Sequence, residues 1–405
     1  MRGDNDNLNL DVNLDFDLNL DWAMNNTEKA FFELIKSGLW EDLKFKDESL
    51  KFKDFGSADW DAVLLLAREQ SVVGLLAAGL DYVKDVQVPH GWAFQVVRKA
   101  LSLEQKNRNK NVFVNEMMSE LEREGIRPVM VKGQGLAQCY KRPLWRASGD
   151  IDLYMDEDDF QKAKAFFRPR VNKFDPDNDY AKHINMHCKG WVVEIHANQH
   201  SRLSERTDRV LDEVHRDIFY KGGVRIWDNG GKAVTLPSAD NDAILVFTHF
   251  LHHFYNGGIG LRQICDWCRL LYTYRDSLNY GLLESRIRQM GLLTEWKVFG
   301  ALAIEYLGYP KDSMPLLNDN DNLDLDDNLR RKADRIMDFI MEVGNFGHNR
   351  DTSYYGKYPF VVRKAISFGV RMKDVLRHAR IFPADSLRFM LNMMRHSFKA
   401  VSHGE

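Results

Sequence analysis

Two aspartates separated by one apolar residue, Asp150-Ile151-Asp152, followed by Leu153, offer the spacing best suited to chemistry. Because side chains alternate between the two faces of a strand, a strand here places both carboxylates on one face, ~6.5 Å apart, with Ile151 and Leu153 on the other. Such a pair can hold a divalent metal ion that handles phosphates. We expect the apolar pair in the core and the carboxylates on a solvated cleft face. Asp-x-Asp is also common on solvated edge strands, so the neighbouring segments decide the interpretation.

Upstream of this pair, residues 127–131 predict a short buried strand, which a glycine-containing turn joins to a helical run at 136–141. The turn consists of Lys132, Gly133, Gln134 and Gly135. Glycines let the backbone approach a ligand closely, and the free amides that open a helix attract phosphate. An ordinary strand-to-helix turn has the same pattern, so the turn gains meaning only beside the aspartates.

Downstream, residues 191–196 alternate in the way that is typical of a half-buried strand. Glu194 and His196 share the face opposite Val193 and Ile195. A third carboxylate on a neighbouring strand could complete a two-metal site or take a proton from an attacking hydroxyl, although such a residue on its own is more often a solvent-facing strand residue. Two metals about 4 Å apart need converging ligands, so this hypothesis requires the three carboxylates to lie within about 8 Å of one another.

The order of these features resembles the nucleotidyltransferase superfamily that includes DNA polymerase beta. More narrowly, the chain resembles a bacterial family of uncharacterised nucleotidyltransferases over roughly residues 60–280. Four segments carry that resemblance: Val131-Lys132-Gly133, the Tyr140/Pro143/Arg146 stretch, Asp150-Ile151-Asp152-Leu153 and Val193-Glu194-Ile195-His196. Many superfamily members place Gly-Ser at the helix start, whereas this chain has Lys132-Gly133-Gln134-Gly135, so Lys132 could supply the phosphate contact as a point charge.

The resemblance implies a role for each site residue. Asp150, Asp152 and Glu194 would be catalytic and would hold Mg²⁺ (or Mn²⁺). The turn from Lys132 through Gly133 and Gln134 to Gly135 would bind the nucleotide. Arg146 would neutralise charge that builds on the phosphates.

Length and periodicity predict the architecture. The 405 residues exceed the usual limit for one core, so two or three domains are expected. We predict an α+β fold in which a small mixed β-sheet, the nucleotidyltransferase core, is embedded between mainly α-helical regions. The predicted parts are a disordered Asp/Asn/Leu tail at 1–21, a helical region at 22–125, the α/β core at 126–237 and a helical domain at 238–405. The tract at 4–11 recurs at 319–326, which predicts a low-complexity loop near 317–328, with a weak acidic calcium site as the alternative.

Composition and charge limit the classes of protein to which this chain can belong. A formal net charge of −3 gives no global attraction to nucleic acid. The four cysteines, Cys139, Cys188, Cys265 and Cys268, are too few for a disulfide framework. No signal peptide and no integral membrane segment are expected, because the N-terminus is acidic and the longest apolar run, 71–80, is half a membrane span. We therefore expect a cytoplasmic location.

Six histidines and one Cys-x-x-Cys motif are possible zinc ligands. The histidines are His183, His187, His196, His249, His252 and His253. Without a pattern such as His-Glu-x-x-His, polar lining of a cleft is the favoured interpretation, with zinc as the alternative. Cys265 and Cys268 lie in an amphipathic helix and are predicted to be core residues. On that helix Arg262 and Asp266, four residues apart, are predicted to form a surface pair.

The segment at 361–400 alternates basic and apolar residues and predicts basic amphipathic helices. The favoured interpretation is a packed helix pair with a solvated basic face. Docking of an RNA, an anionic glycan or an acidic membrane surface is the alternative.

These features together predict a metal-dependent nucleotidyltransferase that passes an NMP from an NTP to an acceptor and releases pyrophosphate. The acceptor is open among a small molecule, a glycan, a protein and an RNA, and the oligomeric state is open as well. Two alternatives belong to other classes. One is a catalytically inactive nucleotide-binding regulator, and the other is a helical interaction scaffold in which the three carboxylates are surface charges.

Overall fold

The computed structural model describes residues 24–41, 57–83, 88–171, 173–174, 183–201, 203–317, 326–350 and 357–390. Helices dominate this part of the chain, and the predicted α+β class is confirmed. The predicted tail at 1–21 lies outside the described residues, as does the part of the predicted loop at 318–325. The proposed domain boundaries stay a prediction.

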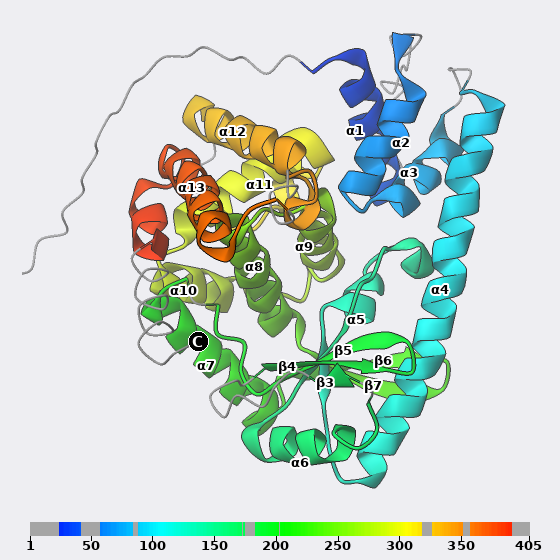
Figure 1. Ribbon diagram of the computed structural model, residues 1–405, viewed down its shortest axis with the longest axis vertical. Coiled ribbons are helices and arrows are strands. Elements are labelled where there is room, and N and C mark those ends of the chain that lie inside the picture. Colours follow the sequence, from blue (N-terminus) through cyan, green and yellow to red (C-terminus); the bar gives the residue numbers. More distant parts are fainter. Residues whose placement is uncertain are drawn as a thin grey trace, which may run out of the picture.

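The N-terminal region is helical, as predicted. It contains α1 (Asn26–Leu39), α2 (Trp60–Glu69), α3 (Val73–Gly79), the short η2 (Leu80–Tyr82) and α4 (His90–Arg123). Asp59 caps α2 by accepting a hydrogen bond from the backbone amide of Ala62 at 3.1 Å, as its position before the helix predicts. Helix α4 runs along one side of the molecule, from the N-terminal helices to the sheet (Figure 1).

The central region carries a five-stranded mixed sheet and a separate two-stranded sheet. Its elements are β1 (Val129–Val131), α5 (Gly133–Ala137), η3 (Pro143–Trp145), β2 (Ile151–Tyr154), α6 (Glu157–Phe167), β3 (Lys173–Phe174), β4 (His183–Cys188), β5 (Trp191–His196), α7 (Glu205–Tyr220), β6 (Val224–Asn229) and β7 (Lys232–Pro237). The strand order is β1-β2-β5-β4-β3, in which only β2 and β5 are parallel. This register places Asp152 directly opposite Glu194.

The two faces of the large sheet differ in character. Ile151, Leu153, Val193 and Ile195 pack in one buried cluster with apolar side chains of α4 and α6. The opposite face carries Asp152 and the other polar residues of β2 and β5. The alternation read from the sequence therefore holds on both strands.

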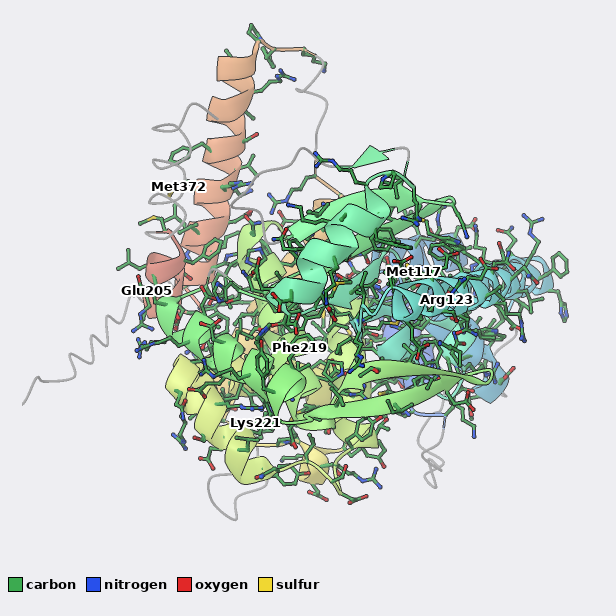
Figure 2. All side chains as sticks on the ribbon, turned by 90° about the horizontal axis from the view of Figure 1, so that it is seen from below. Met117, Arg123, Glu205, Phe219, Lys221 and Met372 are labelled. Atoms are coloured by element: carbon green, nitrogen blue, oxygen red, sulfur yellow. The ribbon has the colours of Figure 1, made fainter. Side chains whose placement is uncertain are left out.

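The C-terminal region is again helical. It contains α8 (Ala239–Asn256), α9 (Leu261–Thr273), α10 (Tyr280–Met290), α11 (Leu293–Leu307), η4 (Lys311–Ser313), α12 (Asp327–Val343), η5 (Asn345–Gly347) and α13 (Phe360–Ala379). Helices α8 and α9 lie between the sheet and the other helices of this region (Figure 1). Helix α13, which carries Met372, projects from the body of the molecule (Figure 2). Within the described residues, no helix combines the length and apolar character that crossing a bilayer requires.

Candidate metal and nucleotide site

A single backbone turn joins β1 to α5 at the edge of the site. Lys132 has φ 57° and ψ −142°, a conformation that non-glycine residues rarely adopt, and Gly133 follows with φ 42°. The sequence predicted a helical run at 136–141, but α5 spans Gly133–Ala137, because the turn is completed within Lys132 and Gly133. Strained backbone of this kind persists where the surroundings enforce it, often at binding sites.

The three predicted carboxylates converge. One oxygen each from Asp150, Asp152 and Glu194 lies within 4.8 Å of the others, well inside the limit of about 8 Å that the hypothesis required. Asp150 precedes β2, Asp152 lies within it, and Glu194 projects from the same face of the neighbouring strand. An all-oxygen donor set of this kind fits a hard divalent cation such as Mg²⁺ or Mn²⁺.

Asp152 is the most enclosed of the three, at 3% exposure. The expectation of a solvated face is therefore wrong for this residue, because Lys132 and His196 cover it. The Lys132 ammonium lies 2.9 Å from Asp152 Oδ1, and His196 Nε2 lies 3.1 Å from the same atom. Burial opposes ionisation, but the Lys132 charge and the His196 hydrogen bond outweigh it, so the pKa of Asp152 lies below its ordinary value.

The pKa of Asp150 is shifted in the opposite direction. Burial, followed by the negative charges of Asp152 and Glu194, raises its pKa, while Lys132 opposes the rise. A bound divalent cation would relieve the part of this rise in pKa that comes from repulsion among the clustered carboxylates.

The other predicted nucleotide-binding residues divide into two groups. Lys132, Gly133 and Arg146 line the same cleft as the carboxylates. Gln134 and Gly135 are buried instead. The Gln134 amide donates to Asn111 Oδ1 at 2.6 Å, and a Cβ on Gly135 would come 2.8 Å from a methyl group of Leu236. Gly135 thus allows α5 to pack closely on β7.

Arg146 is buried in a bidentate ion pair with Asp266 of α9. Its Nε and Nη2 lie 2.7 and 2.6 Å from the two carboxylate oxygens, and the Tyr140 hydroxyl donates to Oδ1 at 2.7 Å. The predicted surface pair between Arg262 and Asp266 is wrong, because Asp266 points into the protein and bonds Arg146. Arg262 instead donates from Nη1 to the carbonyl of Ala147 at 3.1 Å.

The cleft has a volume of about 790 Å³ and lies between the polar face of the sheet and helices α8 and α9. That size suits a small-molecule ligand. Five of the six histidines considered above line it, namely His183, His196, His249, His252 and His253, so their predicted place in the lining of a cleft is confirmed. His187 is exposed on β4 and is not among the lining residues.

Two of these histidines, His249 and His253 of α8, lie on the side of the cleft that faces Lys132. His249 Nδ1 lies 3.4 Å from the Lys132 ammonium, and the rings of His249 and His253 are 4.5 Å apart. Burial, then the charge of Lys132, holds the pKa of His249 well below its ordinary value; burial, then His252, lowers that of His253 to about 4. These two imidazoles are neutral at pH 7, so they contribute hydrogen-bonding groups to the cleft and no charge. Their four-residue spacing, which is visible in the sequence, indicates that both lie on the same face of a helix.

All four cysteines are free and buried. Cys265 and Cys268 lie on α9 with no exposed surface, which confirms their assignment to the core. Burial raises the pKa of the Cys265 thiol well above its ordinary value, so this thiol is unreactive.

Comparisons with known proteins agree with this geometry. No curated protein and no solved structure matches the chain significantly. Residues 56–308, which are more than half of the chain and include the whole carboxylate cluster, match the family described as "Uncharacterised nucleotidyltransferase". The chain therefore belongs to this family of uncharacterised nucleotidyltransferases.

Proposed function

We propose that the protein is a metal-dependent nucleotidyltransferase that passes an NMP from an NTP to an acceptor hydroxyl or phosphate. The observation that carries this proposal is the convergence of Asp150, Asp152 and Glu194 within 4.8 Å inside a cleft of nucleotide size. Membership of the nucleotidyltransferase family supports it. The same convergence argues against the interaction scaffold, in which these carboxylates would be dispersed surface charges.

The carboxylates would hold Mg²⁺ or Mn²⁺. When bound, such a cation would neutralise the charge of the triphosphate and stabilise the attacking and leaving oxygens. Glu194 orients the acceptor and takes its proton as the acceptor oxygen bonds to the α-phosphorus. The bond from that phosphorus to the bridging oxygen of the β-phosphate breaks, and pyrophosphate leaves with the electron pair.

Cationic side chains on the opposite wall of the cleft receive the phosphates. Arg262 lies near Arg146, which already pairs with Asp266, so a phosphate group would give Arg262 an anionic partner in addition to the nearby Asp266 and Asp150. Lys132 lies between the carboxylates and α8. It exchanges its contact with Asp152 for a phosphate oxygen when the nucleotide and its cation enter.

The test is a screen of the four NTPs with Mg²⁺ or Mn²⁺, in which pyrophosphate release and label transfer onto acceptors in a cell extract are measured. Glu194→Gln should reduce turnover by roughly a hundredfold or more, while NTP affinity stays within about tenfold, because Asp150, Asp152 and the cationic wall remain. The control is Glu116→Gln on α4, whose carboxylate is exposed and lies outside the cleft. It should match the wild type.

Two outcomes separate the proposal from the alternatives. If the wild type binds NTP with magnesium but releases no pyrophosphate with any acceptor, the protein is an inactive nucleotide-binding regulator. If the wild type binds no NTP at all, the nucleotidyltransferase proposal is wrong for this chain.

A further inference from the structure

Two histidines on neighbouring strands face each other beside the carboxylate cluster. In the antiparallel register of β4 and β5, His183 is the direct partner of His196, and their rings stack with centroids 4.5 Å apart. Glu194 lies two residues before His196 on the same strand face. Three potential metal ligands are therefore brought together by strand pairing alone.

The atoms that could bind a metal also converge. His183 Nε2 lies 3.1 Å from Glu194 Oε2, and His196 Nε2 lies 3.6 Å from the same oxygen. All three potential ligand atoms lie within 4.8 Å of one another. The group opens into the cleft, because the side chains of His183 and Glu194 are 46% and 21% exposed. A cation there would have positions left for water or substrate.

The donor set differs in kind from the three carboxylates. Two imidazole nitrogens and one carboxylate are typical of catalytic zinc sites and of other first-row transition-metal sites with open positions. Mg²⁺ strongly prefers oxygen ligands, so it would be a poor occupant of this group.

We propose that His183, His196 and Glu194 form a second cation site that binds a divalent transition metal, zinc above all, in preference to Mg²⁺. Glu194 belongs to both groups, so it links this site to the one formed with Asp150 and Asp152. The proposal uses residues of the cleft but does not depend on nucleotidyl transfer being the reaction.

The experiment measures metal binding directly, with no nucleotide present. The full chain is stripped with a chelator and titrated with Zn²⁺ by calorimetry in the presence of excess Mg²⁺. One equivalent of zinc should bind, and X-ray absorption at the zinc edge should show two imidazole nitrogens. Loss of a partner that merely orients a ligand costs about 10–100-fold in metal affinity, so His183→Ala, which removes a ligand itself, should weaken zinc binding at least about tenfold.

The chain supplies a matched control in His187, which lies on the same strand, is exposed and stands outside both groups of potential ligands. His187→Ala should keep wild-type zinc affinity. His183 is itself half-exposed, so its replacement should leave the fold intact, which circular dichroism verifies. His183→Asp offers a second variant, because an oxygen ligand should shift the preference from Zn²⁺ towards Mn²⁺.

Two results would overturn the proposal. One is the absence of stoichiometric zinc binding by the wild type. The other is zinc affinity that His183→Ala leaves unchanged, which would place the metal elsewhere. Neither result bears on pyrophosphate release with Mg²⁺, so failure of this site and failure of the proposed function are read independently.

Discussion

Asp152 shows which properties of a site residue can be predicted from the sequence and which cannot. Its position on β2 follows from the alternation of the sequence, and so does the burial of Ile151 and Leu153 on the other face. Its contacts do not, because Lys132 lies 20 residues away and His196 lies 44 residues away. Spacing along a strand predicts which face a side chain occupies, whereas its neighbours across the cleft depend on how the sheet and α8 pack.

Arg262 illustrates the same limit. Four-residue spacing on a helix predicted a pair with Asp266, but the bidentate geometry of Arg146 occupies both oxygens of that carboxylate. The Arg262 Nε has no hydrogen-bond partner among the described residues and is buried at the cleft. Burial, then the neighbouring charge of Arg146, lowers the pKa of Arg262. Both features favour an anionic ligand as its missing partner.

We predict that Arg262→Ala weakens NTP binding by roughly tenfold to a hundredfold, which is the value of a hydrogen bond to a charged group of about 1.5–3 kcal/mol. Titration calorimetry with NTP and Mg²⁺ measures the change. Arg288→Ala serves as the control, since that guanidinium is exposed on α10 and pairs with Glu284. Unchanged affinity in Arg262→Ala would remove this arginine from the phosphate-binding wall.

At the scale of elements, a loop tied to α4 leads into the Asp-x-Asp strand. The Lys110 ammonium is fully buried and donates to Ser148 Oγ and to the Gly149 carbonyl, both at 2.6 Å. Asn107, one turn earlier, donates to the carbonyl of Arg146 at 2.8 Å. This role was not predicted from the sequence, because Lys110 lies in a polar stretch of helix that is typical of a solvated face, and its two partners, the Ser148 hydroxyl and the Gly149 carbonyl, are distant in the sequence.

Lys110 predicts a pH dependence of stability. Burial, then the charge of Lys106, lowers its pKa from 10.5 to about 8; Asp150 opposes this shift, while Arg146 and Arg262 add to it. Between pH 8 and 10.5 the unfolded chain thus binds more protons at this residue than the folded chain does. The free energy of unfolding therefore increases as the pH rises through this range. Urea titrations at about pH 7 and about pH 9.5 should show the wild type gaining stability relative to Lys110→Met. A constant difference between the two proteins would contradict the shifted pKa.

A close contact between Gly74 and Trp145 holds η3, the short helix that precedes Arg146, in place. A Cβ on Gly74 of α3 would lie 1.8 Å from the carbonyl oxygen of Trp145, at the end of η3, and neither backbone can yield cheaply. Gly74→Ala should therefore destabilise the protein by about 2 kcal/mol or more and lower NTP affinity, because η3 must move. Gly91→Ala on α4 is the control: its Cβ meets nothing within 4 Å, so it should be neutral or slightly stabilising. Thermal unfolding and NTP titration compare the two, and equal stability would show that α3 does not fix the turn.

At the scale of the whole molecule, one buried cluster includes residues of α1–α4 and of α7–α12, while a second lies between the sheet, α4 and α6. Arg269 of α9 links the regions further by donating to the carbonyls of Cys139 and Leu39 at 2.8 and 3.0 Å. Periodicity predicted the class and order of these regions. It could not predict a shared core, because an apolar helix face shows that it is buried but does not show against which partner.

The cleft therefore has walls from two parts of the chain, the sheet with Asp152 and Glu194 on one side and α8 and α9 on the other. A ligand that contacts both walls stabilises the folded state by mass action, by about 2.7 kcal/mol at a hundred times its Kd. We predict that an NTP with Mg²⁺ raises the Tm by several degrees, and that either component alone raises it less.

Asp152→Asn makes that prediction specific. It removes a ligand charge from the carboxylate cluster while keeping the side-chain shape, so the joint effect of NTP and Mg²⁺ on the Tm should fall to that of the NTP alone. Because Asp152 is buried against Lys132, the variant without ligand should also be less stable than the wild type, by about 1–3 kcal/mol. Differential scanning fluorimetry measures both quantities. If the joint shift persists in Asp152→Asn, the cation and the nucleotide are bound without this carboxylate, and the site must be rebuilt around Asp150 and Glu194.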